Sequence, residues 1–459
     1  MTVPHSIENR GECTAILGAQ WGNEGKGKLV AHLCETADVC ARFNGGANNI
    51  HTLSIDHKGE VYIGRDSELP SPSSRMKHTL VLRLFPLGVI NKNCQIVFGN
   101  GMVLHLPTLL EEIRAIEAAF DPNVRSRIFI STRAHVVFDF HLEMDGVFDK
   151  LRGVNQLGTT QKGIGPAYST KTIRNGIRVG DFVSESAVVR EKLVDLTQYF
   201  QKYESGLTVD VDKVLTETLT VFQELRPRVT DTVSLMNEFS LAKKSIVCEG
   251  ANSVMSDIDF GTYPYVTSSN TTPGAASVGL GIPPTRLTNI IGVCKAYTSR
   301  AQHWFPSSLG ASDTAISDHL VARGRETGTS SNKARRVGWL DLVQVKYACE
   351  ISGFDELMLT KLDALSGLEQ IGIVTKYKNF NVDKTGYPST IEEFSRIEPE
   401  VEYVPGWSSS LASVSSITNL PENAKLFIQK IESYLHVPIT RVQLGCSETN
   451  LSANDIITL

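Results

Sequence analysis

The apolar residues of this chain form short continuous runs that alternate with stretches of helical periodicity. The runs lie at residues 14–19, 245–248, 289–293 and 356–359, and each ends at a polar segment. Short runs of this kind indicate buried strands. Leu109, Leu110, Ile113 and Ile116 recur at helical spacing behind Pro107, which suits the first turn of a helix. Residues 189–203, 214–225 and 424–435 show further amphipathic patterns.

The alternation of strands and helices predicts an α/β fold, with a mostly parallel central sheet flanked by helices in one large unit with insertions. No stretch has the composition of a linker, so residues 1–459 are expected to form a single domain. Residues 1–13 are predicted to be a flexible N-terminus, and residues 64–77, rich in Ser, Pro and charge, an inserted exposed loop. Ligands of such sheets bind at the carboxyl ends of the strands, where these polar segments are expected.

Composition and charge mainly exclude some classes of protein. With 45 Lys and Arg against 50 Asp and Glu, the net charge of -5 gives no general attraction for nucleic acid or a membrane surface. No run approaches the ~18 apolar residues of a membrane span, and residues 1–13 lack the apolar core of a secretory signal. The eight cysteines show no C-x-x-C spacing, which favours reduced thiols and a cytoplasmic protein.

Candidate chemistry begins directly after the first strand, in the segment Gly18-Ala-Gln-Trp-Gly-Asn-Glu-Gly-Lys-Gly-Lys28. Its glycines let backbone N–H groups approach phosphate oxygens, the following helix N-terminus attracts anions, and Lys26 and Lys28 add positive charge. It differs from the common nucleotide loop G-x-x-x-x-G-K-[ST], because Gln20 replaces the first glycine and Gly27 the Mg²⁺-binding hydroxyl. A phosphate loop is the favoured interpretation, and a glycine turn that only packs is the alternative.

Residues 20–28 closely resemble the signature Q-W-G-D-E-G-K-G-K of the adenylosuccinate synthetase family, with Asn23 in place of the aspartate. The resemblance continues in the family's order along nearly the whole chain. It includes Arg42-Phe-Asn-Gly-Gly, Phe98-Gly-Asn-Gly-Met102, Ser131-Thr-Arg-Ala-His135, Gly158-Thr-Thr-Gln-Lys-Gly-Ile-Gly-Pro-Ala-Tyr168, Glu249-Gly-Ala-Asn252, residues 257–272, Thr360-Lys-Leu-Asp363 and Leu420-Pro-Glu-Asn-Ala424. On these motifs the chain is identified as a member of that family.

The resemblance implies a GTP-dependent ligase of purine (AMP) biosynthesis with a fold like that of the phosphate-loop NTPases. Such enzymes use GTP and Mg²⁺ to phosphorylate the 6-oxygen of IMP, and the amine of L-aspartate then displaces the phosphate to give adenylosuccinate. The expected partners are therefore GTP, IMP and L-aspartate, with a second copy of the chain in a homodimer. Nucleic acid and membranes are not expected as partners.

The resemblance also implies a set of site residues, grouped by ligand. The expected catalytic residues are His51, Lys26 and Asn23, the last at the position of the family's aspartate base. GTP is assigned to Gly22, Glu24, Gly25, Lys26, Gly27, Lys28, Lys361 and Asp363. IMP is assigned to Asn48, Thr160, Arg174, Asn252 and Thr267, with Arg174 reaching in from the other subunit, and aspartate to Lys333 and Arg335. Mg²⁺ is assigned to Asn23 and the backbone of Ile50.

Several of these positions depart from the family's pattern. Asn23 replaces a carboxylate that can accept a proton near neutral pH, which an amide does not do. Asn49-Ile50 stands where members have Ala-Gly, Lys333 replaces an arginine, and residues 445–448 replace a Gly-Pro-x-Arg segment. Three interpretations remain open: a slow or re-tuned synthetase, a paralogue that binds nucleotide without turnover, and a ligase acting on a 2-amino purine nucleotide. Errors in the translated sequence are a further explanation of the divergent patches.

Overall fold

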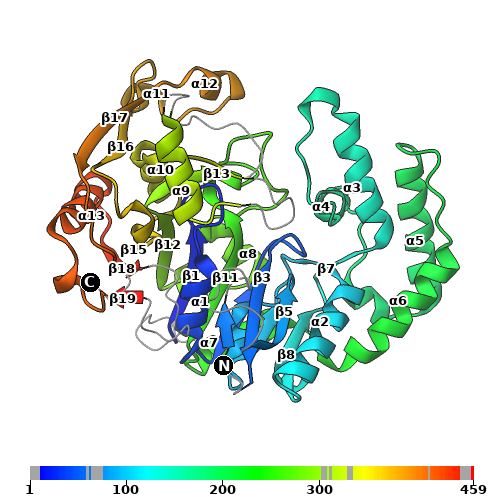
Figure 1. Ribbon diagram of the computed structural model, residues 1–459. Helices are drawn as coiled ribbons and strands as arrows, with labels where there is room; N and C mark the ends of the chain where they lie inside the picture. Colours follow the sequence, from blue (N-terminus) through cyan, green and yellow to red (C-terminus); the bar gives the residue numbers. More distant parts are fainter. Residues whose placement is uncertain are drawn as a thin grey trace.

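The computed structural model describes residues 11–57, 61–63, 76–300, 308–309, 313–327, 334–411, 414–444 and 456–458. A large sheet runs through the centre of the molecule, and helices lie on both of its sides (Figure 1). Within this described part, no helix combines the length and the apolar character needed to cross a membrane.

The central sheet has ten strands in the order β10-β8-β6-β2-β11-β1-β12-β15-β18-β19. Every neighbouring pair is parallel except β18 with β19, which is antiparallel. The strands are β1 (Cys13–Gly18), β2 (Val39–Arg42), β6 (Gln95–Phe98), β8 (Ile128–Ser131), β10 (Val229–Thr230), β11 (Ile246–Ser253), β12 (Asn289–Lys295), β15 (Glu356–Thr360), β18 (Ile439–Gln443) and β19 (Ile456–Thr458). The four predicted apolar runs are β1, β11, β12 and β15, which lie side by side at the centre.

Both faces of this sheet are buried under helices. Successive residues of a strand point to opposite sides, so neighbouring residues of one strand belong to different cores. Ile16 of β1 packs in one core with Leu29 of α1, while Leu17 packs in the other with Leu280 of α8. The helices are α1 (Lys26–Cys34), α2 (Leu106–Ala119), α3 (Asp139–Leu151), α4 (Ile164–Thr172), α5 (Ser186–Gln201), α6 (Val211–Leu225), α7 (Thr232–Leu241), α8 (Pro273–Leu280), α9 (Thr314–Arg323), α10 (Leu342–Ser352), α11 (Val382–Thr385), α12 (Ile391–Arg396) and α13 (Glu422–Leu435).

Three smaller sheets complete the fold. One has the order β13-β14-β16-β17, a second β4-β3-β5, and a third pairs β7 with β9. Their strands are β3 (His51–Asp56), β4 (Val61–Ile63), β5 (Met76–Leu82), β7 (Val103–His105), β9 (His135–Val137), β13 (Tyr297–Arg300), β14 (Arg336–Asp341), β16 (Gln370–Tyr377) and β17 (Pro399–Pro405). In Figure 1, α3, α4, α5 and α6 form one side of the molecule, away from β16 and β17.

The predicted α/β class with a mostly parallel sheet is confirmed, and the predicted helices are α2, α5, α6 and α13. Two predicted boundaries need correction. Cys13 is buried as the first residue of β1, so the N-terminal segment is shorter than residues 1–13. Met76 and Lys77 begin β5, because Met76 pairs with Asp56 of β3. Residues 1–10 and 64–75 lie outside the described residues, so the predictions for them stay predictions.

Candidate active site

The candidate site lies at the carboxyl ends of four adjacent strands. β1 ends at Gly18, β12 at Lys295 and β15 at Thr360, and β11 contributes Ser253. A Cβ on Gly18 would lie 2.0 Å from Ser253 Oγ, so only glycine allows the chain to turn out of β1 at this point. Thr360 Oγ1 donates to the carbonyl of Glu24 at 2.6 Å, which ties β15 to the loop after β1.

A buried carboxylate holds the loop between β1 and α1. Glu24 is fully buried and accepts hydrogen bonds from the backbone N–H groups of Gln20 at 3.2 Å and Gly22 at 2.7 Å. Gly22, Asn23 and Gly25 have positive φ values of 103°, 60° and 91°. Glycine enters this region freely, and asparagine tolerates it better than most residues. The loop ends at the N-terminus of α1, where unpaired N–H groups and the helix dipole attract anions.

Lys26 opens α1 and forms a buried ion pair with the same loop. Its Nζ lies 3.0 Å from Glu24 Oε2 and 3.1 Å from Ser253 Oγ, and the Lys26 and Glu24 side chains are 12% and 0% exposed. Burial by itself raises the pKa of Glu24, but the adjacent Lys26 ammonium outweighs it and holds that pKa below its ordinary value. Lys26 therefore supports the loop as well as presenting positive charge to the cavity.

Replacing Lys26 with methionine is expected to lower the free energy of unfolding by about 3–5 kcal/mol, because Glu24 is left charged and unpaired in the interior. Urea titration followed by circular dichroism measures this loss. Because the pKa of Glu24 is depressed in the folded state, the pair stabilises the protein above the unfolded-state pKa of about 4.3. The advantage of the parent should disappear as the pH falls through the folded-state pKa.

The matched control is the double variant Glu24→Gln/Lys26→Met, which removes both charges and should recover most of the lost stability. A Lys26→Met protein as stable as the parent at pH 7 would show that the pair does not hold the loop.

His51, the first residue of β3, reaches the first turn of α1 from the opposite side of the cavity. Its Nε2 lies 2.8 Å from Glu249 Oε1, and Glu249 Oε2 accepts from the backbone N–H of Leu87 at 2.8 Å. Burial by itself raises the pKa of Glu249, but His51 and Arg42 hold it below its ordinary value, so an ionised carboxylate faces Nε2. A Cβ on Gly27 would lie 3.1 Å from His51 Nδ1 and 2.7 Å from Leu87 Cδ1. The ring therefore packs directly against the N-terminus of α1.

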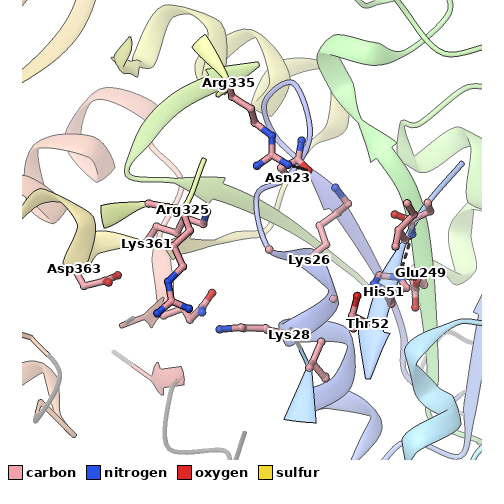
Figure 2. Close-up of a pocket in the computed structure, with 18 of the residues that line it drawn as sticks. Asn23, Lys26, Lys28, His51, Thr52, Glu249, Arg325, Arg335, Lys361 and Asp363 are labelled. Atoms are coloured by element: carbon pink, nitrogen blue, oxygen red, sulfur yellow. Dashed lines mark hydrogen bonds and ion pairs between the residues drawn. The ribbon is translucent and has the colours of Figure 1, made fainter. Parts of the chain in front are cut away.

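Lys26 and His51 line one cavity of about 400 Å³. Figure 2 shows Lys361 and Asp363 at its other side, on the turn after β15, with Lys28 between the two groups. Basic side chains outnumber acidic ones in the lining, which holds Lys26, Lys28, Arg323, Arg325, Arg335 and Lys361 against Glu249 and Asp363. A basic cavity over a helix N-terminus suits a polyphosphate ligand.

Asn23, one of the three residues predicted as catalytic, contacts a residue predicted to bind aspartate. Asn23 is exposed, and its Oδ1 accepts a hydrogen bond from Arg335 NH2 at 3.1 Å (Figure 2). Arg335 NH1 donates to Glu326 Oε2 at 2.8 Å. The structure therefore brings Arg335 to the cavity. Lys333 and residues 445–448 lie outside the described residues, so their assignments stay predictions.

The residues predicted to bind IMP do not line this cavity. Two of them are close to it along the chain, because Asn48 precedes Asn49, and Asn252 shares β11 with Gly250, and both Asn49 and Gly250 line the cavity. The buried Nδ2 of Asn252 has no hydrogen-bond partner in the described part of the protein, and a bound ligand can satisfy such an atom. The others are Asn48 and Thr267, which are half-buried, and Thr160 and Arg174, which are exposed beside α4.

The described residues offer few charged side chains as ligands for the Mg²⁺ that the resemblance implies. Among the described residues, no group of three or more His, Cys, Asp or Glu side chains is placed to hold a metal ion. Glu24 is paired with Lys26 and Glu249 with His51. Asn23 and Ile50 both line the cavity, so a Mg²⁺ ion here would take most of its oxygen ligands from phosphates and water. Mg²⁺ is commonly bound in that way, and the residues present fit it.

Sequence reasoning alone does not assign roles to Glu249, Lys295 and Glu326. Glu249 and Lys295 follow apolar runs, and a polar residue at a strand end is a signal that points to a site. Glu326 gives no such signal, because it lies between predicted elements. Only the fold brings it against Lys361 and Arg335, with which it pairs at 3.2 Å and 2.8 Å.

Comparisons with known proteins agree with the resemblance. A family model described as adenylosuccinate synthetase matches residues 15–451. The chain is 40% identical to the adenylosuccinate synthetase of Trichoplax adhaerens over 446 residues, which are 97% of this chain and 96% of that relative. The fully ligated adenylosuccinate synthetase from Plasmodium falciparum is similar in structure, with a TM-score of 0.84 and 37% identity over 98% of this chain and 100% of that one.

A more distant structure shows likeness in fold alone. It is the succinoaminodeoxyadenylate synthetase of cyanophage S-2L bound to dGMP and dATP, with a TM-score of 0.59 and 19% identity. The match covers 98% of this chain and 95% of that one.

Proposed function

Because the chain belongs to the adenylosuccinate synthetase family, whose members are ligases, we propose that it converts GTP, IMP and L-aspartate into GDP, phosphate and adenylosuccinate. The observation that carries the proposal is the shared cavity. Lys26 and His51 line it at the N-terminus of α1, and Lys361 and Asp363 line it at the other side. This arrangement supports a triphosphate lying along the first turn of α1 with its base against the turn after β15.

In this proposal the chain's own groups stabilise the charge that develops as the γ-phosphoryl group moves to the 6-oxygen of IMP. Phosphoryl transfer depends mainly on positioning and on donors placed around the transferring group. Lys26 and the first-turn N–H groups of α1 act from one side and the His51 ring from the other. Glu249 orients that ring through the 2.8 Å contact with Nε2, so that Nδ1 faces the first turn of α1. When bound, Mg²⁺ neutralises phosphate charge, and Asn23 and the Ile50 backbone are the groups we assign to it.

We assign guanine recognition to Asp363, with Lys361 beside it. A carboxylate accepts from both N1–H and the 2-amino group of guanine, and adenine offers neither donor there. Asp363→Asn is expected to raise the KM for GTP about 10- to 150-fold, the equivalent of about 1.5–3 kcal/mol for hydrogen bonds to a charged group. Steady-state kinetics with GTP and IMP varied separately measure the effect.

Xanthosine triphosphate is the matched control nucleotide, because its 2-carbonyl accepts from an amide where guanine donates to a carboxylate. The Asp363→Asn enzyme should use it better than the parent does. Equal rises in the KM values for GTP and IMP would contradict the assignment of Asp363 to the base.

We also propose a homodimer in a reducing, cytoplasmic setting. Arg174 is exposed beside α4, as is expected of a residue that completes a partner's site, and Leu151 and Val154, which precede α4 in the chain, are 67% and 100% exposed. The cysteines in the described part of the chain are free and buried, which supports a reducing compartment. Sedimentation equilibrium at micromolar concentration tests the assembly, and a monomer at every concentration would overturn it.

A direct assay tests the proposed activity. The purified protein is incubated with GTP, IMP, L-aspartate and Mg²⁺, and product is separated by chromatography. Formation of adenylosuccinate supports the proposal, and its absence at every pH rejects it. A parallel reaction with dGMP in place of IMP identifies a ligase for 2-amino purine nucleotides.

A nucleotide-binding role without turnover is the second candidate, and Asn23 favours it. An amide that accepts a hydrogen bond from Arg335 offers the purine no proton acceptor near neutral pH. Tight calorimetric binding of GTP and IMP, with no product in either reaction, would establish this role.

A further inference from the structure

A fully buried carboxylate lies behind the cavity, on the segment between α9 and β14. Glu326 has 0% of its side chain exposed. Its oxygens accept hydrogen bonds from Lys295 Nζ at 3.1 Å, Tyr297 OH at 2.7 Å, Ser299 Oγ at 3.0 Å, Arg335 NH1 at 2.8 Å and Lys361 Nζ at 3.2 Å. This carboxylate therefore organises several elements that are distant in sequence.

The two oxygens of Glu326 serve different ends of the site. Oε1 accepts from Lys361, which lines the cavity two residues before Asp363. Oε2 accepts from Arg335, which lines the cavity and donates to Asn23 at 3.1 Å. A carboxylate is planar and rigid, so rotation of Glu326 to favour one donor moves the oxygen that serves the other. The positions of Lys361 and Arg335 are therefore linked through one group.

The link is strengthened by charge, because three cationic side chains surround the single carboxylate. Lys295, Lys361 and Arg335 all lie within 3.2 Å of the one anion, as salt bridges. Burial by itself raises the pKa of Glu326, but these cations hold it well below its ordinary value. Burial also lowers the pKa of Lys295 to about 8. In so buried a cluster, the loss of one contact changes how firmly the remaining ones are held.

We propose that Glu326 is a positioning residue that couples the base end of the nucleotide site, through Lys361, to the aspartate end, through Arg335. The inference rests on the proposed function, in which Lys361 lies beside the base, and on the assignment of aspartate to Arg335 that the family resemblance implies. A guanine bound against Lys361 fixes the donor to Oε1, and Glu326 is then held in the orientation in which Oε2 accepts from Arg335. The guanidinium is thereby preset for the substrate carboxylates. Occupation of the base site raises the affinity for aspartate, and linkage makes the effect reciprocal.

Glu326→Gln tests the coupling, because the amide keeps the shape of the side chain and leaves only one oxygen for five donors. The KM for aspartate is measured at GTP concentrations well below and well above the KM for GTP. In the parent, saturating GTP should lower the KM for aspartate about 5-fold or more. In the variant this ratio should fall to about 1–2-fold, while kcat at saturation of all substrates changes less than the ratio does. A purely structural role would lower the thermal midpoint and leave the ratio unchanged.

Tyr297→Phe is the second variant, because it removes only the 2.7 Å contact to Oε1 and keeps the charges in place. It should fold, and should reduce the ratio in the same direction by a smaller factor. A folded Glu326→Gln protein with the parent's ratio overturns the inference, and so does a parent ratio of one. If Glu326→Gln does not fold, an unchanged ratio in Tyr297→Phe overturns it.

Failure of the proposed function is recognised separately. If the parent forms no adenylosuccinate, the coupling is measured as the Kd for aspartate with and without saturating GDP, by calorimetry on the same proteins. An effect of GDP that is lost in Glu326→Gln supports the coupling even then, and no effect of GDP in the parent rejects it.

Discussion

Replacing Asn23 with aspartate is expected to raise the turnover of adenylosuccinate synthesis about 100- to 10,000-fold, the usual contribution of a positioned general base. The backbone can accept the change, because aspartate tolerates the φ of 60° at this position about as well as asparagine does. Arg335, 3.1 Å from Oδ1, would pair with the new carboxylate and keep it ionised near neutral pH. Single-turnover and steady-state assays on the two proteins measure the gain.

Asn23→Ala is the matched control for this substitution. It removes the hydrogen bond to Arg335 without adding a carboxylate, so it should not raise turnover. Calorimetry of GTP binding on all three proteins separates a change in chemistry from a change in affinity. Equal turnover in the parent and Asn23→Asp would mean that another group already takes the proton, or that another departure from the family pattern limits the rate.

The elements at the centre of the sheet are predictable from sequence because their signals are local. The runs that become β1, β11, β12 and β15 are continuous in sequence, and their burial on both faces explains why they do not alternate. The turn after β1 is equally local, since its glycines and lysines are contiguous with the first strand. Because parallel strands end at one edge, the position of the site follows from the same pattern.

The contacts that make the site specific are not local, and they could not be predicted. His51 and Glu249 are separated by 198 residues, and Asn23 and Arg335 by 312. Nothing in the residues around Glu326 indicates that it will be buried among cations, because its partners come from β12, β13, the residue before β14 and the turn after β15. The boundaries at Cys13 and Met76 were wrong for a related reason, since each of these residues pairs with a strand that is distant in sequence or across a loop: Cys13 with Ile246, and Met76 with Asp56.

Replacing His51 with alanine is expected to lower kcat about 100- to 1,000-fold, the usual cost of removing one donor from a site that stabilises a developing anion. The substitution is best measured in the Asn23→Asp background as well as in the parent, so that a slow parent does not hide the loss. The KM for GTP should change much less, because Lys26, Lys28 and the first turn of α1 remain in place. Rates at saturating substrate, measured across pH, test both statements.

The control for His51→Ala must account for Glu249. In the parent its side chain is 2% exposed and lies 2.8 Å from His51, and the substitution removes this partner. In the parent the pKa of Glu249 is depressed, so its pairing stabilises the fold above the unfolded-state pKa and loses that effect as the pH falls through the folded-state pKa. Glu249→Gln keeps a hydrogen-bond acceptor for Nε2 and removes only the charge. It should lower kcat less than His51→Ala does. A larger loss in Glu249→Gln than in His51→Ala would reverse the roles, and make the carboxylate rather than the imidazole the group on which transfer depends.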